Sequence, residues 1–358
     1  MRLIGFLPLV LAAMTLAACS SIKDRVPIFT ELPPAALVAE EPYARSMHRF
    51  ELDAASGDVI GTLQITRAQH EDTFVDLARR FNVGYDELVR ANPKVDPWLP
   101  GEGREILLPT QHVLPNAPRE GIVINLAAMR LFYFPRRNAR EEQVVYTFPI
   151  GIGRVGFATP EGRTRVTRMA KNPSWRPGPG VRRERREQGE LLPAVVPPGP
   201  DNPLGSRAMY LSWPSYLIHG TNQPAGIGLR SSAGCIRLFP EDVELLYELV
   251  RPGTTVTVVN QPIVFGERGG VILVQSFDVL EDDRRDVRTL AKRGMPRALT
   301  ARVQASLDPQ VLTRLTAAPR GVPLSLTVSG DELESARASA QRVRNALPIG
   351  ASWSGEGE

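Results

Sequence analysis

The alternation of apolar and polar positions first predicts a small βααβ unit in residues 61–111. Residues 62–66 alternate as in a short strand, and residues 106–109 have the pattern of a second strand that closes the unit. Between them, apolar residues at helical spacing predict one helix from about residue 74, capped by Asp72 or Thr73, and a second helix over residues 85–92. The apolar face of the first helix consists of Phe74, Leu77, Ala78 and Phe81.

Residues 118–262 carry many short alternating runs separated by Gly and Pro. This pattern is typical of a β-rich sandwich or a barrel-like domain. Its one clear helix is Pro240–Val250, and residues 172–205 are so rich in Pro and Gly that we expect a long loop there. The predicted strands are a hairpin over 121–135 and single strands over 144–152, 163–168, 210–218 and 254–260, with one more over 270–275.

Residues 263–358 form an extension to which the sequence assigns no role. Residues 284–293 and 332–347 have helical patterns, and residues 324–328 have the pattern of a strand. The whole chain is therefore predicted to be α+β and mainly β, with an α/β C-terminal extension.

The first residues have the pattern of a secretory signal and are excluded from this fold. Arg2 precedes an apolar run over residues 3–16, and small residues then lead to Cys19. Residues 19–60 are rich in Pro, Ala and Glu, which is typical of a tether. The sequence shows no second run of about 18 apolar residues that would cross a membrane.

Composition adds little about the partner. Of the 358 residues 42% are apolar, as in an ordinary globular protein, and the net charge is +4. This charge suits work beside an anionic polymer but is too small to indicate nucleic acid. The densest basic stretch, Arg182–Arg186, is interrupted by Glu184, which favours a solvated loop over a binding patch.

Two cysteines stand out because the chain has no others. If Cys19 is modified at the cleavage site, Cys235 has no partner in an oxidising compartment, which favours a reactive thiol. A small buried hydrophobic residue is the alternative.

A cysteine nucleophile needs a base, a group that orients the base, and donors for the oxyanion. His219 ends an apolar strand, and Gly220 after it allows another segment to approach closely. Cys235 follows Gly234 in a turn before the Pro240 helix, where backbone N–H groups can face an anion and a protonated imidazole would lower the thiol pKa. The spacings typical of metal, phosphate-loop and dinucleotide sites are absent from the sequence, so we expect no metal and no cofactor.

The segment from Ile218 to Leu238 closely resembles the catalytic domain of L,D-transpeptidases of the YkuD type. Their signature is a histidine, a gap, and then Ser-His-Gly-Cys with Arg or Asn two residues later; here the gap is 235 − 219 = 16 positions. Ala233 stands in the place of the second histidine, so the role of that histidine is not transferred. The resemblance covers about residues 118–280 and includes the segments 121–126, 149–153, Thr159-Pro160 and 199–203.

This resemblance implies that Cys235 attacks the carbonyl between the third and fourth residues of a peptidoglycan tetrapeptide stem and releases D-alanine. An amine of an acceptor stem, or of a protein lysine, then resolves the thioester. His219 would be the base, oriented by the carbonyl of Gly220, and the N–H groups of Gly234 and Cys235 would be the oxyanion donors.

Three residues are candidates for substrate binding. Arg237 has a planar fork that suits a stem carboxylate, although an ion pair with Glu241 or Asp242 is the alternative. Trp175, in the long loop, would line a substrate groove or lie at the solvent edge, and Ser232 belongs to the signature.

Two further resemblances concern the N-terminal part. Residues 61–111 resemble the LysM glycan-binding module, although Glu71 stands where LysM usually has glycine. Residues 16–19 resemble the lipobox of bacterial lipoproteins, which implies cleavage before Cys19 and acylation of its thiol, and Ser20 then favours the outer membrane. Together the resemblances indicate the ErfK/YbiS-like branch: a periplasmic, lipid-anchored enzyme that contacts the glycan strands and stem peptides of peptidoglycan.

Rival functions remain open at this point. An L,D-carboxypeptidase, or a hydrolase that detaches protein from the wall, would use the same acyl-enzyme with water as acceptor. A non-catalytic wall-binding lipoprotein would rely on residues 61–111 alone. A papain-like peptidase is disfavoured because it would place the cysteine before the histidine in the chain.

Overall fold

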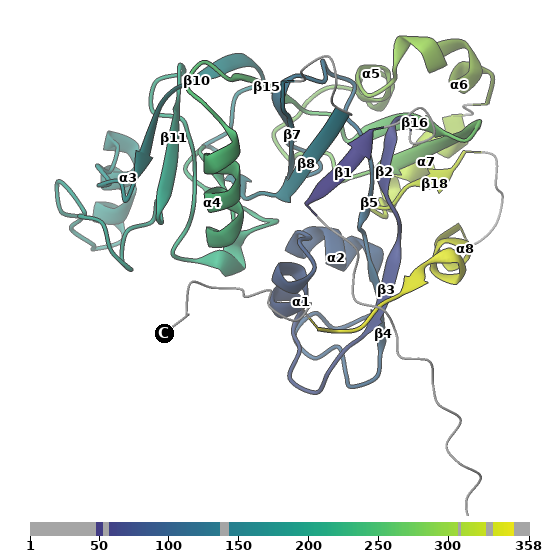
Figure 1. The fold of residues 1–358 in the computed structure, drawn as a ribbon, viewed down its shortest axis with the longest axis horizontal. Helices are drawn as coiled ribbons and strands as arrows, with labels where there is room; N and C mark the ends of the chain where they lie inside the picture. The colour runs from purple at the N-terminus through teal and green to yellow at the C-terminus, as the bar shows by residue number, and fades with distance from the viewer. Residues whose placement is uncertain (1–47, 53–56, 137–142, 307–308, 327–331, 347–358) are drawn as a thin grey trace, which may run out of the picture. The chain divides into compact units, whose positions relative to one another are not determined.

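The computed structural model describes residues 48–52, 57–136, 143–306, 309–326 and 332–346 as a mixed α/β, strand-rich protein (Figure 1). The predicted signal, Cys19 and most of the predicted tether lie outside these residues. Within the described ranges, no helix is both long enough and apolar enough to cross a membrane.

A nine-stranded sheet occupies the central part of the chain, with its strands in the order β1-β8-β7-β6-β15-β10-β11-β12-β14. The pairs β6–β15 and β12–β14 are parallel, and the other neighbours are antiparallel. β1 forms one edge of this sheet, whereas β14 at the other end also pairs with Gly151, shortly after β8, through two backbone hydrogen bonds of 2.9 Å between Gly151 and Arg237. The strands are β1 Arg49–Leu52, β6 Gly121–Asn125, β7 Arg130–Phe134, β8 Gln143–Pro149, β10 Gly162–Lys171, β11 Arg207–Leu211, β12 Leu217–His219, β14 Ile236–Arg237 and β15 Thr255–Val259.

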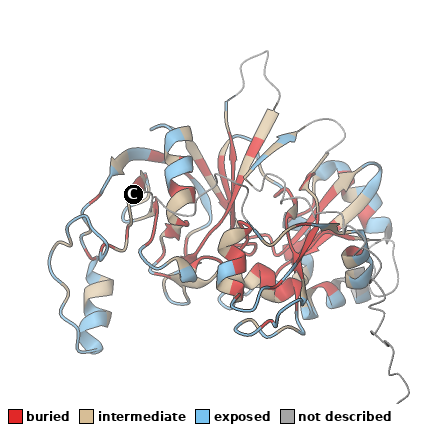
Figure 2. Cartoon of the chain, turned by 60° about the horizontal axis from the view of Figure 1, so that its bottom comes forward, coloured by how far each residue is buried: buried red, intermediate tan, exposed pale blue. Residues whose placement is uncertain are grey.

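The predicted hairpin over residues 121–135 is confirmed as the antiparallel pair β6–β7. Because successive side chains of a strand point to opposite faces, β6 contributes to two cores. Ile122 and Ile124 lie in the main core, which helix α4 (Pro240–Leu249) covers, whereas Val123 packs in a separate cluster on the other face. Figure 2 shows buried residues along the strands of this sheet.

The strand that we predicted over residues 210–218 is in fact two strands, β11 and β12. A tight turn separates them, in which the N–H of Tyr216 donates to the carbonyl of Trp213 over 3.3 Å. Pro214 occupies the second position of this turn, and Ser215 adopts a positive φ of 67° at the third, as a type II turn requires. Apolar residues on both sides of Pro214 hid this turn from the sequence pattern.

The predicted loop over residues 172–205 contains a helix, α3 (Pro179–Glu187). Gly178 precedes it and Pro179 is its first residue, a position that proline tolerates because the N–H there has no helical partner. None of its residues is buried, so the apolar periodicity by which helices are recognised is missing.

The predicted βααβ unit is present as β3 (Gln64–Arg67), α1 (Phe74–Arg80), α2 (Tyr85–Ala91) and β4 (Glu105–Leu108). Thr73, rather than Asp72, caps α1 and forms a capping box with Asp76. The core of the unit lies between its helices and its sheet.

The C-terminal extension contributes strands to two sheets. β16 (Ile263–Arg268), β17 (Val271–Ser276) and β18 (Leu324–Ser325) form one sheet, and β16 was not predicted. The helix predicted over residues 332–347 ends early: α8 covers Glu332–Ser339, and β19 (Gln341–Arg342) then pairs in parallel with β3. The other elements are α5 (Val287–Arg293), η2 (Arg297–Leu299), α6 (Thr300–Ser306) and α7 (Pro309–Ala317).

The residue after β19 ties this extension to the βααβ unit. Val343 is fully buried in the core of the unit, and the hydroxyl of Thr66 donates to the Val343 carbonyl over 2.9 Å. Asn345 Nδ2 donates to the carbonyl of Arg67 over 2.8 Å. The βααβ unit is therefore completed by residues that lie near the other end of the chain.

The predicted tether does not reach residue 60. Arg49–Leu52 forms the edge strand β1 beside β8, and β2 (Val59–Gly61) pairs with β5 (Gln111–Val113). Phe50 packs against the cluster of Val123 and Phe132, which explains why a segment with little periodicity is nevertheless ordered.

Candidate active site

Cys235 lies immediately before β14, between the turn that contains Gly234 and helix α4. Gly234 has a φ of 103°, and a Cβ at this position would come within 3.0 Å of the Tyr216 ring. Glycine is therefore required immediately before the cysteine.

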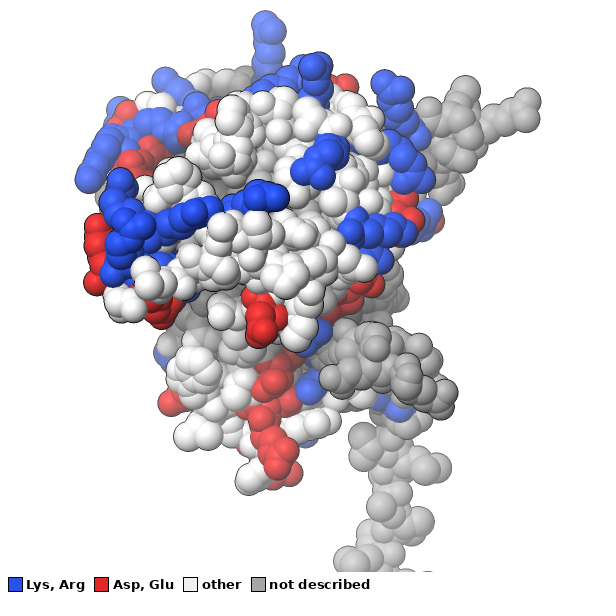
Figure 3. All heavy atoms as spheres, turned by 90° about the vertical axis from the view of Figure 1, so that its left-hand side faces the viewer, with Lys and Arg blue, Asp and Glu red and all other residues white. Residues whose placement is uncertain are grey.

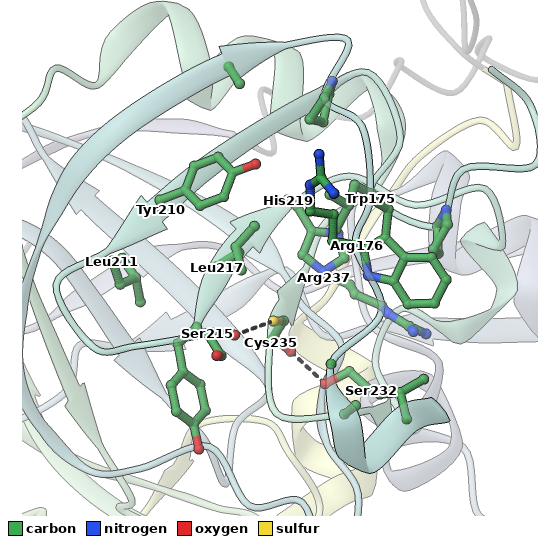
Figure 4. Close-up of a pocket in the computed structure, with 18 of the residues that line it drawn as sticks. Trp175, Arg176, Tyr210, Leu211, Ser215, Leu217, His219, Ser232, Cys235 and Arg237 are labelled. Carbon is green, nitrogen blue, oxygen red and sulfur yellow. Dashed lines mark hydrogen bonds between the residues drawn. The ribbon is translucent and has the colours of Figure 1, made fainter. Parts of the chain in front are cut away.

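His219 ends strand β12, and Cys235 immediately precedes the adjacent parallel strand β14. The register pairs Ile218 with Ile236 and His219 with Arg237, so Cys235 comes two residues before the position opposite the histidine. Figure 4 shows the sulfur of Cys235, the ring of His219 and the guanidinium of Arg237 around one cavity. The pairing of these two short strands thus brings His219 and Cys235, which are 16 positions apart in the sequence, to the same cavity.

The imidazole of His219 is buried and fixed by backbone carbonyls. Its Nδ1 lies 2.6 Å from the carbonyl oxygen of Gly220, and because a carbonyl only accepts, Nδ1 carries the proton of the neutral ring. Burial and the charge of Arg237 lower the pKa of His219 to about 3, against the opposing effect of hydrogen bonds to the Gly220 and Leu204 carbonyls. The ring is therefore neutral at physiological pH, and Nε2 is free to accept a proton.

The thiol of Cys235 does not have the lowered pKa that we expected. Burial raises its pKa, while a hydrogen bond from the Leu217 backbone and the charge of Arg237 act in the opposite direction. The Sγ–H donates to the carbonyl of Ser215 over 3.6 Å. Because His219 is neutral, it supplies no charge that would stabilise the thiolate, so the resting pair is a thiol and a neutral imidazole.

The turn before Cys235 is held by hydrogen bonds of its own side chains. Ser232 Oγ donates to the carbonyl of Cys235 over 2.6 Å and accepts from the N–H of Gly234 over 3.1 Å. Gly234 therefore has its N–H occupied, contrary to its expected role as an oxyanion donor. Ser232 is buried and supports the turn, although it also lines the cavity where we expected it to bind substrate.

Thr159 is a supporting residue whose role the sequence did not show. Its hydroxyl donates to the carbonyl of Gly234 over 2.8 Å and accepts from the N–H of Gly153 over 3.2 Å. It thereby fixes the peptide that carries the N–H of Cys235. The Thr159-Pro160 motif was a signal that this position mattered, but no pattern in sequence indicated a contact over 75 positions.

Arg237 does not form the ion pair that was its alternative role. Glu241 bonds instead to Arg79, and Asp242 bonds to His48. Burial lowers the pKa of Arg237, and its Nε is buried without a hydrogen-bond partner among the described residues. The guanidinium is thus available to an anion in the cavity.

A cleft of about 670 Å³ contains these residues, and we call it the catalytic cleft. Its walls come from β10, β11, β12 and the segment 173–181, and they include the aromatic side chains of Tyr210, Trp213 and Tyr216. Trp175 is half-buried in this wall, where its backbone pairs with that of Val196. Trp175 therefore lines the catalytic cleft, and its contact with substrate stays a prediction.

The βααβ unit touches the segment that leads to Cys235. A Cβ on Gly228, which has a φ of 82°, would lie 2.2 Å from the backbone nitrogen of Tyr85 in α2. The unit is also bound to the large sheet through a buried ion pair, in which Arg130 donates to Glu87 through Nε (2.9 Å) and a terminal nitrogen (2.7 Å). The approach to the nucleophile is thus packed against the first helical unit.

Comparisons with known proteins all identify L,D-transpeptidases as similar. The family model described as the L,D-transpeptidase catalytic domain matches residues 119–258. Among curated proteins, the chain is 40% identical over 260 residues to the "Probable L,D-transpeptidase YcfS" of Escherichia coli, covering 70% of this chain and 79% of the relative. It is 40% identical over 235 residues to "Probable L,D-transpeptidase ErfK/SrfK" of the same species, covering 65% and 74%.

A solved structure, that of the "Ldtfm-avibactam carbamoyl enzyme", is also similar. It is 21% identical with a TM-score of 0.30, and the match covers 40% of this chain and 50% of that one. The relation of this chain to known proteins consequently rests on the sequence comparisons.

Proposed function

The chain belongs to the L,D-transpeptidase family of cell-wall cysteine acyltransferases, and we propose that it acts through Cys235 as nucleophile and His219 as base. The observation that carries this proposal is a buried, neutral histidine on the strand beside the cysteine, with Nδ1 fixed by the Gly220 carbonyl. This arrangement fixes the tautomer in which Nε2 takes the thiol proton. The substrate is a peptidoglycan tetrapeptide stem.

In the first half-reaction the proton of Sγ passes to Nε2 of His219 as the sulfur attacks the carbonyl carbon of the third stem residue. The C–S bond forms, the C–N bond to D-alanine breaks, and the imidazolium returns its proton to the leaving amine. In the second half-reaction an amine attacks the thioester carbon, the C–N bond forms, and the sulfur leaves and recovers a proton. The amine belongs to an acceptor stem or to a protein lysine.

Two groups are proposed to support the transition state. The Cys235 N–H faces the reacting carbonyl as oxyanion donor, and the hydrogen bonds of Thr159 and Ser232 hold its turn in place. Arg237 binds a stem carboxylate through its guanidinium. Trp175 packs along the stem.

The test is incubation of the purified soluble chain with defined tetrapeptide muropeptides, followed by mass spectrometry. A cross-linked dimer is the expected product, and Cys235→Ala is the matched control that should give none. Tripeptide alone would identify an L,D-carboxypeptidase instead. No change in the substrate would refute the enzymatic function and favour a wall-binding lipoprotein.

We further propose that residues 61–111 are a LysM-like module that binds the glycan strands. Supporting this are the helix pair on a small sheet and the exposed side chains of Trp98 and Leu99 in the loop between α2 and β4. Trp98 lies 6.2 Å from the ring of Tyr85, so an aromatic surface is available to sugar rings. Sacculi stripped of stem peptides should retain the wild-type chain and release Trp98→Ala; equal retention of both would contradict this role.

The remaining proposals concern location and domains. Residues 1–18 are proposed as a lipoprotein signal, Cys19 as the acylated residue, residues 118–262 as the catalytic domain, and the outer membrane facing the periplasm as the site of action. Cys19→Ser should then be soluble or unprocessed after detergent partitioning of whole cells. Unchanged membrane partitioning of this variant would exclude the anchor.

A further inference from the structure

A second cavity of about 560 Å³ adjoins the catalytic cleft, and we propose that it receives the acceptor amine as an ammonium ion, which Asp201 recognises. This inference rests on the proposed transfer reaction, and it names the class of acceptor and a specificity-determining residue. We call this space the acceptor cavity.

The acceptor cavity and the catalytic cleft meet along a shared wall. Among the residues that line both spaces, Ala233 lies two positions before the nucleophile, and Arg237 lies two positions after it. The other shared residues are Trp175, Val181 and Pro203. A group bound in the acceptor cavity is therefore next to the segment that carries the thioester.

The two spaces differ in charge. The described residues that line the catalytic cleft include Arg168, Arg176 and Arg237 and no carboxylate, which suits the carboxylates of a donor stem. Figure 3 shows Lys and Arg side chains spread over the upper part of one face of the molecule. The acceptor cavity combines three arginines with three carboxylates: Arg154, Arg185 and Arg237, and Glu184, Glu190 and Asp201.

Most of these charges in the acceptor cavity are already paired. Arg154 forms an ion pair with Glu184, and Arg185 forms one with Glu190 over 2.8 Å. Asp201 is the carboxylate of this set that has neither an ion pair nor a side-chain hydrogen bond among the described residues. A cationic ligand in the acceptor cavity would therefore meet this unpaired carboxylate.

Asp201 is exposed but stands on a rigid turn. Its neighbour Asn202 is fully buried, and Asn202 Nδ2 donates to the carbonyls of Pro173 (2.8 Å) and Pro197 (3.0 Å). Asn202 Oδ1 accepts from the N–H of Leu204 over 2.9 Å. The turn therefore keeps its position whether or not the Asp201 side chain is charged.

The role of Asp201 is to hold the amine, not to activate it. The ammonium ion binds beside the carboxylate and loses one proton, to solvent or to His219, before the neutral amine attacks the thioester carbon. The C–N bond forms, the C–S bond breaks, and the second amine proton leaves as Sγ recovers one. Water carries no positive charge and gains nothing from Asp201, so the carboxylate favours amide formation over hydrolysis.

The experiment uses as donor a tetrapeptide muropeptide whose own amine is blocked by acetylation, so that it cannot act as acceptor. The acceptor is a tripeptide muropeptide, which has no fourth residue to release. For Asp201→Asn we expect the acceptor concentration at half-maximal amide formation to rise about fivefold, the size expected for loss of one partly exposed ion pair. The ratio of hydrolysed to cross-linked product should rise with it. Release of D-alanine at zero acceptor should keep its wild-type rate, because donor acylation does not involve Asp201.

Two controls make the result specific. Asp201→Glu should restore most of the acceptor affinity, and Glu281→Gln, which removes an exposed carboxylate outside the cavity, should behave as wild type. An unchanged acceptor dependence in Asp201→Asn, with normal D-alanine release, would refute this inference and leave the proposed function intact. A wild-type chain that releases no D-alanine would refute both, and one that only hydrolyses the donor would refute the transfer step and this inference with it.

Discussion

His219 and Arg237 occupy directly opposite positions on the parallel strands β12 and β14. The fixed charge of Arg237 adds to the effect of burial and keeps the imidazole neutral to about pH 3. The same guanidinium opposes the rise of the Cys235 pKa. One residue therefore makes the base ready to accept a proton and makes the thiol easier to ionise.

Removal of the base tests the first consequence of this arrangement. His219→Ala should slow acylation of Cys235 by about 10²–10⁴-fold, the usual contribution of a positioned acid–base group. Intact-mass measurement of the acyl-enzyme adduct with a tetrapeptide muropeptide gives the rate, and Cys235→Ala should form no adduct. Ala233→His should alter the rate less than His219→Ala does, since Ala233 contributes no proton-transferring group. Adduct formation by Cys235→Ala would show that the nucleophile has been misidentified.

The pH dependence of acylation follows from the lowered pKa of His219. An ordinary histidine, with a pKa near 6.5, would be protonated and inactive as a base at pH 5. Since the pKa of His219 is about 3, acylation should keep most of its neutral rate at pH 5 and fall only as the pH approaches that value. Stopped-flow acylation between pH 4 and pH 8 measures this. A midpoint between pH 6 and pH 7 would contradict the burial of the ring.

The same burial should make the fold sensitive to acid. Burial lowers the pKa of both His219 and His112 below the value of the unfolded chain, so the unfolded state binds more protons as the pH falls below about 6.5. Stability is full above that pH and should then fall by up to about 1.4 kcal/mol per pH unit for each histidine. Urea unfolding at pH 7.5, 5.5 and 4.5 measures the slope, and His112→Gln should reduce it. If stability falls with pH equally steeply in the wild type and in His112→Gln, His112 does not contribute to the acid sensitivity of the fold.

The buried pair of Arg130 and Glu87 gives a prediction for the joint between the sheet and the first helical unit. Both side chains are almost fully buried, so removing either partner leaves an unpaired charge in the interior. Glu87→Gln should lower the free energy of unfolding by about 3–5 kcal/mol. Arg49→Gln, at a half-exposed ion pair with Glu51, is the control and should change it by less than about 1 kcal/mol. Similar losses in both variants would contradict a special role for the buried pair.

Val343 tests the claim that the end of the chain completes the βααβ unit. Val343→Ala removes two methyl groups from a fully buried site and should destabilise this unit by about 1–3 kcal/mol. Hydrogen exchange of the amides in α1 and α2 reads out the unit, and the exposed substitution Ala338→Ser is the control. Unchanged protection in α1 and α2 would show that the unit is stable without its third strand.

Much of the fold could be predicted where one face of an element is apolar. The βααβ unit and the β6–β7 hairpin followed from periodicity, because their inward positions are Leu, Ile and Phe at regular spacing. Helix α3 could not be predicted since it buries no residue, and β19 is too short to carry a period. β1 was missed because its pairing with β8 joins residues nearly 100 positions apart.

For the candidate active site, the sequence indicated which residues take part but not their protonation states. Cys235, His219 and Arg237 were found from motif and spacing, and the structure brings them together. The neutral state of the pair could not be predicted, because it depends on burial by residues distant in sequence. The hydrogen bond that occupies the Gly234 N–H likewise depends on the side-chain rotamer of Ser232.

The pairing of β19 with β3 has a consequence for how the molecule assembles. Gln341 and Gln64 are 277 positions apart, and a ribosome completes the chain from its N-terminus. Domains generally fold as they emerge, but contacts of such long range form only once both ends are available. The first helical unit consequently gains its third strand only after residue 342 has been made, although its two helices and first two strands lie within the first 108 residues.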